Sequence, residues 1–166
     1  MLLPVAIRLE KCEYDVELAE VCTAILALIA QAFTQPSRMS DFLMKIEEVS
    51  HHSSWQCRLS AIDILQVLIF NNMPIVLSQK AWIDQIQSIV LRLLEDNMLE
   101  VRVKTAEVLG GLIHCSFLPA TDKLLELFKK KCQTKIVKRS TTCSLEPNIK
   151  VRHSGVLGLC AFVTGK

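Results

Sequence analysis

Apolar residues recur along the chain at spacings of three and four, which is the period of an amphipathic α-helix. We predict helices at residues 15–33, 37–50, 54–70, 80–94, 99–114, 120–132 and 148–163. Residues 2–9 have the pattern of the last turns of one further helix. Pro36, Pro74 and Pro119 fall between these blocks, where a missing backbone N–H costs little. The pattern predicts an all-α chain of about seven helices.

Three of the predicted helices share one skeleton, Arg-x-x-small-x-x-x-Leu. It begins at Arg58, Arg102 and Arg152. A weaker copy without the arginine passes through an earlier helix. The small residues of the four copies are Cys22, Ala61, Thr105 and Gly155. They are separated by 39, 44 and 50 residues, close to the roughly 40–47 residues of HEAT and armadillo units.

This repeat predicts a right-handed α-solenoid of HEAT-like helix pairs over the single segment 1–166. The small residue lets neighbouring helices approach closely, and the arginine is expected to meet an acidic residue, with Glu95, Asp96 and Glu100 available. The predicted parts are a first unit with a partial preceding helix, two complete units, a polar basic loop and the start of a fourth unit. Their bounds are 1–50, 51–94, 95–133, 134–147 and 148–166.

Both ends of the predicted array lack the polar outer face that a terminal repeat normally carries. We therefore expect the chain to be a piece of a longer array or a truncated product. Uncovered apolar faces also predict self-association.

Small polar residues and tryptophans mark several helix starts. Ser53, Ser54 and Asn97 are expected to accept hydrogen bonds from free backbone N–H groups. Trp55 and Trp82 each begin an amphipathic helix, so burial between repeats is expected rather than a recognition role.

Composition narrows the function classes. Hydrophobic residues make up 51% of the chain and the net charge is only +2, so neither disorder nor a general affinity for nucleic acid is indicated. Seven cysteines, an odd number without a CxxC pair, argue against a disulfide framework or a zinc site and favour a reducing compartment. The longest apolar run, 21–33, is shorter than the roughly 20 residues of a spanning helix, so no membrane partner is expected. No catalytic motif, metal site or cofactor is indicated.

Longer motifs resemble one family. They include Leu65-Gln66-x-x-x-Phe70-x-Asn72, Leu93-Leu94-Glu95-Asp96-x-x-Leu99-Glu100-Val101-Arg102 and Arg152-His153-x-Gly155-Val156-Leu157-Gly158-Leu159. The chain, over nearly its whole length, resembles the proteasome activator complex subunit 4 family of large, ATP-independent HEAT-repeat proteins. The resemblance implies a dome on the proteasome core particle that assists degradation without ATP. It also implies a place in the nucleus and cytoplasm and links to DNA repair, spermatogenesis and acetylated histones.

The same resemblance implies that a C-terminal hydrophobic-Tyr-x tail opens the gate of the core particle. This chain ends Thr164-Gly165-Lys166. It is expected to be unable to open the gate on its own.

An acetyl-lysine reader is a further implication of the resemblance. The family's Asn-Phe pair and earlier aromatic residue match Ser116, Phe117 and Val76 here. A serine hydroxyl has a shorter reach than an asparagine amide toward an acetyl carbonyl. The alternative is that Ser116 and Phe117 end one helix and pack against the next.

One dense cluster of basic residues lies between positions 129 and 139. We define the basic cluster as Lys129, Lys130, Lys131, Lys135, Lys138 and Arg139. It is interpreted as a nuclear-import signal or as a site for inositol phosphates, which the family binds, and alternatively as a solvated helix end. No aromatic residues interleave it, so direct nucleic-acid binding is not expected.

Three functions therefore stand side by side. The first is a proteasome-activator segment that binds the core particle, acetylated histones or both. The second is an independent acetyl-lysine or histone reader, and the third is a generic HEAT scaffold for protein–protein interaction.

Overall fold

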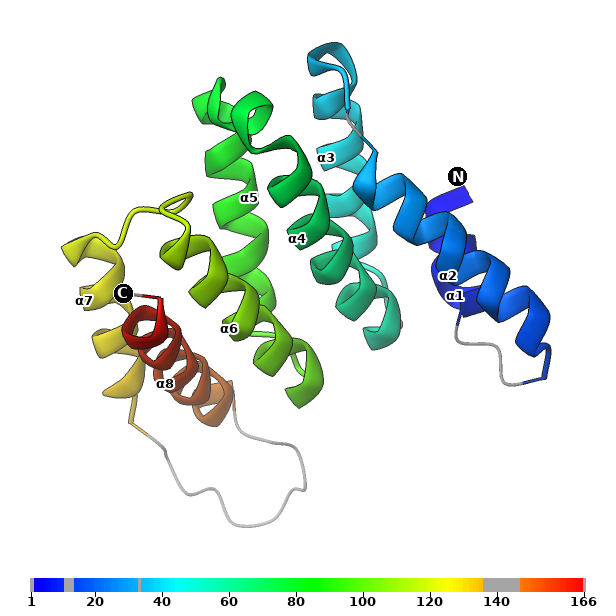
Figure 1. The fold of residues 1–166 in the computed structure, drawn as a ribbon. Coiled ribbons are helices and arrows are strands. Elements are labelled where there is room, and N and C mark those ends of the chain that lie inside the picture. The colour runs from blue at the N-terminus through cyan, green and yellow to red at the C-terminus, as the bar shows by residue number, and fades with distance from the viewer. Residues whose placement is uncertain (1, 11–13, 33, 136–146, 166) are drawn as a thin grey trace. The chain divides into compact units, whose positions relative to one another are not determined.

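The computed structural model describes the chain except at residues 1, 11–13, 33, 136–146 and 166. Eight α-helices and no strand occur within the described residues. Their bounds are α1 Leu2–Glu10, α2 Val16–Gln31, α3 Pro36–Ser50, α4 Trp55–Leu77, α5 Lys80–Leu93, α6 Leu99–His114, α7 Asp122–Cys132 and α8 Pro147–Thr164 (Figure 1). The predicted all-α fold is confirmed, with α1 as the helix expected at 2–9.

The chain divides into two compact units, Met1–Ile89 and Val90–Lys166, and the boundary falls within α5. In the first unit α1 packs on α2, and both α2 and α3 pack on α4. Buried apolar side chains come from all four helices. Examples are Ile7, Leu26, Leu43, Ile46 and Leu65.

In the second unit α6 and α7 both pack against α8 (Figure 1). Gly155 and Gly158 of α8 make the close contact with α7 possible. A Cβ at Gly155 would lie 2.7 Å from the backbone N of Cys132, and one at Gly158 would lie 2.4 Å from the Phe128 ring. No side chain larger than hydrogen fits at either position without a shift of α7.

The repeat skeleton is reflected in the packing. Its carriers are α2, α4, α6 and α8, and the small residues Cys22, Ala61, Thr105 and Gly155 are all buried. Helical-repeat packing within each unit is thus confirmed. The handedness of the array and the division into units at residues 50, 94 and 133 stay predictions.

The end of α4 differs from the sequence prediction. We expected this helix to end at residue 70 with Pro74 outside it, but it continues to Leu77 across a kink at Asn72 (φ −122°, ψ 21°). Pro74 is tolerated because the turn after a kink behaves like a helix start, where a missing N–H is not needed. The prediction that Pro74 separates two helices is therefore wrong.

Helix α4 is also long and apolar enough to cross a membrane, judged by length and composition alone. Half of its most apolar window is buried inside the unit. Packing against α2 and α3 is sufficient to account for that composition.

Two helix caps were predicted incorrectly. Ser54 occupies the N-cap of α4, and Met98 rather than Asn97 occupies that of α6, but neither side chain makes a capping hydrogen bond. Asp15 and Thr121 instead cap α2 and α7 with their side-chain oxygen atoms. Spacing alone did not reveal which polar residue near a helix start points back to the backbone.

Candidate functional site

The repeat arginines clamp the connection that precedes their helix. Arg102 Nη1 donates to the carbonyl oxygens of Asp96 and Asn97, at 2.7 and 3.0 Å. Arg58 Nη1 donates in the same way to His52 and Ser53, at 2.8 and 2.9 Å. The same arginine position thus satisfies the carbonyls five and six residues upstream in both units. These bonds hold the chain at the entry to α4 and α6.

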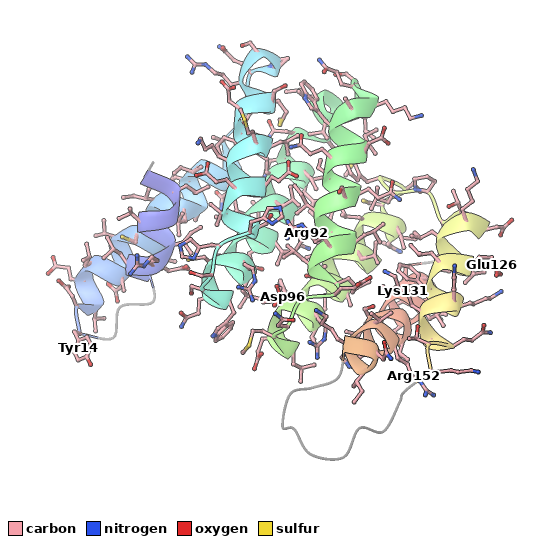
Figure 2. The ribbon with its side chains drawn as sticks, turned by 180° about the vertical axis from the view of Figure 1, so that it is seen from behind. Tyr14, Arg92, Asp96, Glu126, Lys131 and Arg152 are labelled. Carbon is pink, nitrogen blue, oxygen red and sulfur yellow. The ribbon has the colours of Figure 1, made fainter. Side chains whose placement is uncertain are left out.

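The prediction that Arg102 pairs with an acidic side chain is wrong. Among the described residues its remaining hydrogen bond runs from Nε to His153 Nδ1 on α8, at 3.1 Å. Asp96 participates through its carbonyl, while its carboxylate accepts from the Met98 backbone N–H. The third repeat arginine, Arg152, is exposed on α8 (Figure 2).

His153 is the titratable group that this arrangement affects most. Burial, and secondarily the neighbouring Arg102 guanidinium, lower the pKa of His153 below its ordinary value of 6.5. The neutral imidazole is the form that accepts the Arg102 hydrogen bond through Nδ1. Sequence reasoning placed His153 in a motif but did not identify this role.

A second buried polar group, Asn72, was also missed as a functional position. Its Oδ1 accepts from Thr34 N at 2.7 Å, and its Nδ2 donates to the carbonyls of Ala32 and Leu68, both at 3.1 Å. The amide thereby ties the α2–α3 connection to the kink of α4. Its only sequence signal was membership in the motif Phe70-x-Asn72.

The three predicted acetyl-lysine residues have different environments. Val76 is buried in α4 of the first unit, and Phe117 of the second unit is only 2% exposed. Ser116 is exposed directly after α6. A ring as enclosed as Phe117 stabilises its own unit through burial, which supports the packing interpretation that the sequence left open. Acetyl-lysine binding itself stays a prediction.

Ser116 has an unusual backbone. Its φ of 59° is the one positive value at a non-glycine residue in the described chain. The turn ends α6, with Ser116 N donating to Ile113 O at 2.9 Å and Leu118 N to Leu112 O at 3.0 Å. Left-handed conformations favour glycine and asparagine over serine.

The basic cluster is partly neutralised. Lys129 pairs with Glu126 within α7 at 2.8 Å, and Lys131 pairs with Glu95 at 2.5 Å. Lys131 is only 14% exposed, so it links α7 to the α5–α6 connection (Figure 2). Lys130 and Lys135 are exposed, and Lys138 and Arg139 lie outside the described residues.

A polar pocket lies at the start of α4 in the first unit. Its volume is about 420 Å³, and its lining is Arg8, His52, Ser53, Ser54, Gln56 and Cys57. The lining is mostly polar and includes one arginine and one histidine. The sequence predicted these serines only as helix caps and gave no signal that Arg8 lies beside them.

Other candidate chemistry is limited. Within the described ranges, no three His, Cys, Asp or Glu side chains are grouped to hold a metal ion. Trp82 is buried and donates to Ser40 Oγ at 2.9 Å, as expected for a packing residue, whereas Trp55 is half-buried.

Comparison with known proteins adds a relationship. The chain is 31% identical to proteasome activator complex subunit 4B of Danio rerio over 173 residues, 32% identical to subunit 4 of Homo sapiens over 173 residues, and 33% identical to that of Bos taurus over 175 residues. Each alignment covers 98% of this chain and 9% of the relative. No family model matches the chain.

The chain is therefore homologous, along nearly its whole length, to a segment of the proteasome activator complex subunit 4 proteins, as the sequence motifs predicted. It spans about 9% of the length of these relatives.

Proposed function

We propose that this chain acts by binding rather than by catalysis, as a helical-repeat segment of a proteasome activator that associates with the proteasome core particle. The observation that carries the proposal is homology over 98% of the chain to proteins named as proteasome activator subunits.

Residues that carry the resemblance also support a scaffold role. Arg102 clamps the entry to α6, Asn72 fastens the kink of α4, and Gly155 permits the α7–α8 contact. Each of them maintains the shape of a unit. The motif residues thus maintain the helix packing, and a segment with rigidly packed helices can present a binding surface.

The direct test is binding of the purified chain to purified core particle, followed by hydrolysis of a fluorogenic peptide. A second version carries an added hydrophobic-Tyr-x tail, and its matched control has alanine in place of that tyrosine. We expect all three to bind and only the tyrosine tail to stimulate hydrolysis. Absence of binding by every version would contradict the proposal.

Acetylated histones are a second candidate partner because the family resemblance implies an acetyl-lysine reader, and Ser116, the matching residue, is exposed at the turn after α6. Replacing Ser116 with asparagine restores the family residue and also suits the positive φ. We expect Ser116→Asn to bind an acetylated histone peptide more tightly than the parent chain does. Ser116→Gly is the matched control, since it keeps the backbone and removes the side chain. Equal affinities for acetylated and unmodified peptides in all variants would exclude the reader.

Localisation in the nucleus and cytoplasm, and binding of inositol phosphates, would depend on the exposed part of the basic cluster. Lys130 and Lys135 are exposed, whereas Lys131 is engaged by Glu95. The double variant Lys130→Glu/Lys135→Glu should reduce both nuclear accumulation of a fluorescent fusion and affinity for inositol hexakisphosphate. Lys80→Glu, an exposed change in the first unit, is the control. Any role in DNA repair or spermatogenesis would follow from these partners.

A further inference from the structure

The polar pocket of the first unit has a lining rich in hydrogen-bond donors. Helix α1 contributes Arg8, and the α3–α4 connection together with the first turn of α4 contributes the other residues of the lining. Among the described residues that line it there is no carboxylate. The Arg8 guanidinium, which has five N–H donors and no acceptor, therefore meets no competing negative charge within this lining.

The acceptor atoms of the lining are used within the protein. His52 Nδ1 accepts from the Ser54 backbone N–H at 3.0 Å, so the neutral ring carries its proton on Nε2. The carbonyl oxygens of His52 and Ser53 accept from Arg58 Nη1, at 2.8 and 2.9 Å. Gln56 Oε1 accepts from Ser54 Oγ at 3.4 Å. What the His52 ring and the Gln56 amide still offer to a ligand is therefore N–H donors.

The acidic residue nearest to Arg8 along α1 does not belong to the pocket. Glu10 follows Arg8 by two positions, and residues two apart on a helix lie on different faces. Its Oε2 accepts from Ser60 Oγ at 3.4 Å, and it is absent from the described lining. The lining therefore has a net positive charge, which comes from Arg8.

We propose that this pocket binds a phosphate monoester, with Arg8 as its main partner and the side chains of His52 and Gln56 as further donors. A guanidinium can bind two oxygen atoms of a phosphate at once. The other oxygen atoms of a tetrahedral group point in other directions, which suits donors that come from separate elements. The pocket volume of about 420 Å³ also lies in the range of about 300–1,000 Å³ that is typical of small-molecule sites, so it can hold the organic part of an ester.

Titration of the purified chain with phosphoserine, inorganic phosphate and acetate, followed by amide NMR spectra at constant ionic strength, tests the proposal. The backbone N–H signals of Ser54, Gln56 and Cys57 should shift to saturation with phosphoserine. Inorganic phosphate should bind more weakly because it lacks the organic part, and acetate more weakly still because it has only two oxygen atoms. Acetate that binds as tightly as phosphoserine would overturn the assignment to phosphate. Inorganic phosphate that binds more tightly than phosphoserine would overturn the assignment to an ester.

Substitution of Arg8 tests which residue holds the anion. Arg8→Gln should raise the dissociation constant for phosphoserine about tenfold, because a hydrogen bond to a charged group is lost. Arg8→Lys should raise it less, because the charge is kept while the paired N–H groups are lost. Arg8 is exposed, so both variants should fold. Arg38→Gln, at an exposed arginine on α3 of the same unit, is the matched control and should bind like the parent.

Two further results would refute the proposal. An unchanged dissociation constant in Arg8→Gln would show that Arg8 does not hold the phosphate. Shifts confined to α7, around the exposed Lys130, would show that the anion binds the basic cluster instead. Circular dichroism of each variant verifies that the helices are retained. The test does not depend on the core particle, so its outcome is separate from that of the proposed function.

Discussion

Asn72 in the first unit and Arg102 in the second are buried polar side chains that hold a connection by its backbone, and they do so with different chemistry. In the first unit Asn72 both donates and accepts, so its amide satisfies a carbonyl and an N–H of the α2–α3 connection without any charge. In the second unit Arg102 can only donate, so every partner must be an acceptor, and one of them is His153. Because the His153 imidazole can accept from Arg102 only when it is neutral, we expect the stability of the second unit to fall in acid. The Asn72 amide does not titrate, so it gives the first unit no such dependence.

The helix contacts differ in the same two regions. At the small-residue position α4 has Ala61, whereas α8 has Gly155 with α7 backbone within 3 Å of the place of a Cβ. Position 155 of the second unit therefore does not tolerate added volume.

The largest effect is expected from adding a methyl group at Gly155. Gly155→Ala should destabilise the second unit by about 2 kcal/mol, because overpacking against backbone outweighs the gain in helix propensity of about 1 kcal/mol. Hydrogen exchange of α7 and α8 measures the loss. The reciprocal change Ala61→Gly should cost the first unit about 1 kcal/mol. Unchanged exchange in α7 and α8 would show that the contact is looser than described.

Removal of the buried polar groups comes next. Asn72→Leu should cost about 2 kcal/mol and Arg102→Met about 1–2 kcal/mol, because each leaves backbone groups of a connection without their partner. Asn72 is fully buried, whereas water can reach the Arg102 carbonyls more easily. Exchange protection should fall in α2 and α4 for the first variant and in α6 and α8 for the second. Similar protection in parent and variants would mean that the connections are held by other contacts.

Acidification sharpens the comparison between the units. The pKa of His153 is lower in the folded chain than its ordinary value of 6.5, so the unfolded chain binds more protons around that pH. The stability that the neutral imidazole contributes is present above pH 6.5 and is lost as the pH falls through the folded pKa. The melting temperature of the second unit should therefore fall as the pH drops below 6.5, and His153→Asn should flatten that dependence. His114→Asn, at an exposed position, should behave like the parent.

The smallest expected effect concerns the turn after α6. Ser116→Asn should stabilise the second unit by about 0.5 kcal/mol, since asparagine is less disfavoured at a φ of 59°. Ser116→Val should do the opposite, because a β-branched side chain is strained in that region. The shift in melting temperature decides the sign, and stabilisation by valine would argue that the turn does not have this conformation.

Much of the fold was predictable because helix formation depends on neighbours three and four residues apart. The apolar spacing located each helix that occurs within the described residues, and the repeat skeleton identified the small residues that prove to be buried. The kink in α4 was not predictable from Pro74 alone, because it also depends on Asn72 finding partners in another connection.

The sequence by itself determined the all-α class, the repeat and the relationship to the proteasome activator subunits, since these are recorded in spacing and in motifs along the chain. Only the tertiary structure decided the partners of the polar residues. Arg102 meets His153, which is 51 positions away, and Asn72 meets Thr34, 38 positions away. The physical reason is that a hydrogen bond depends on distances of about 3 Å in space, and helix packing brings together residues that no local pattern connects.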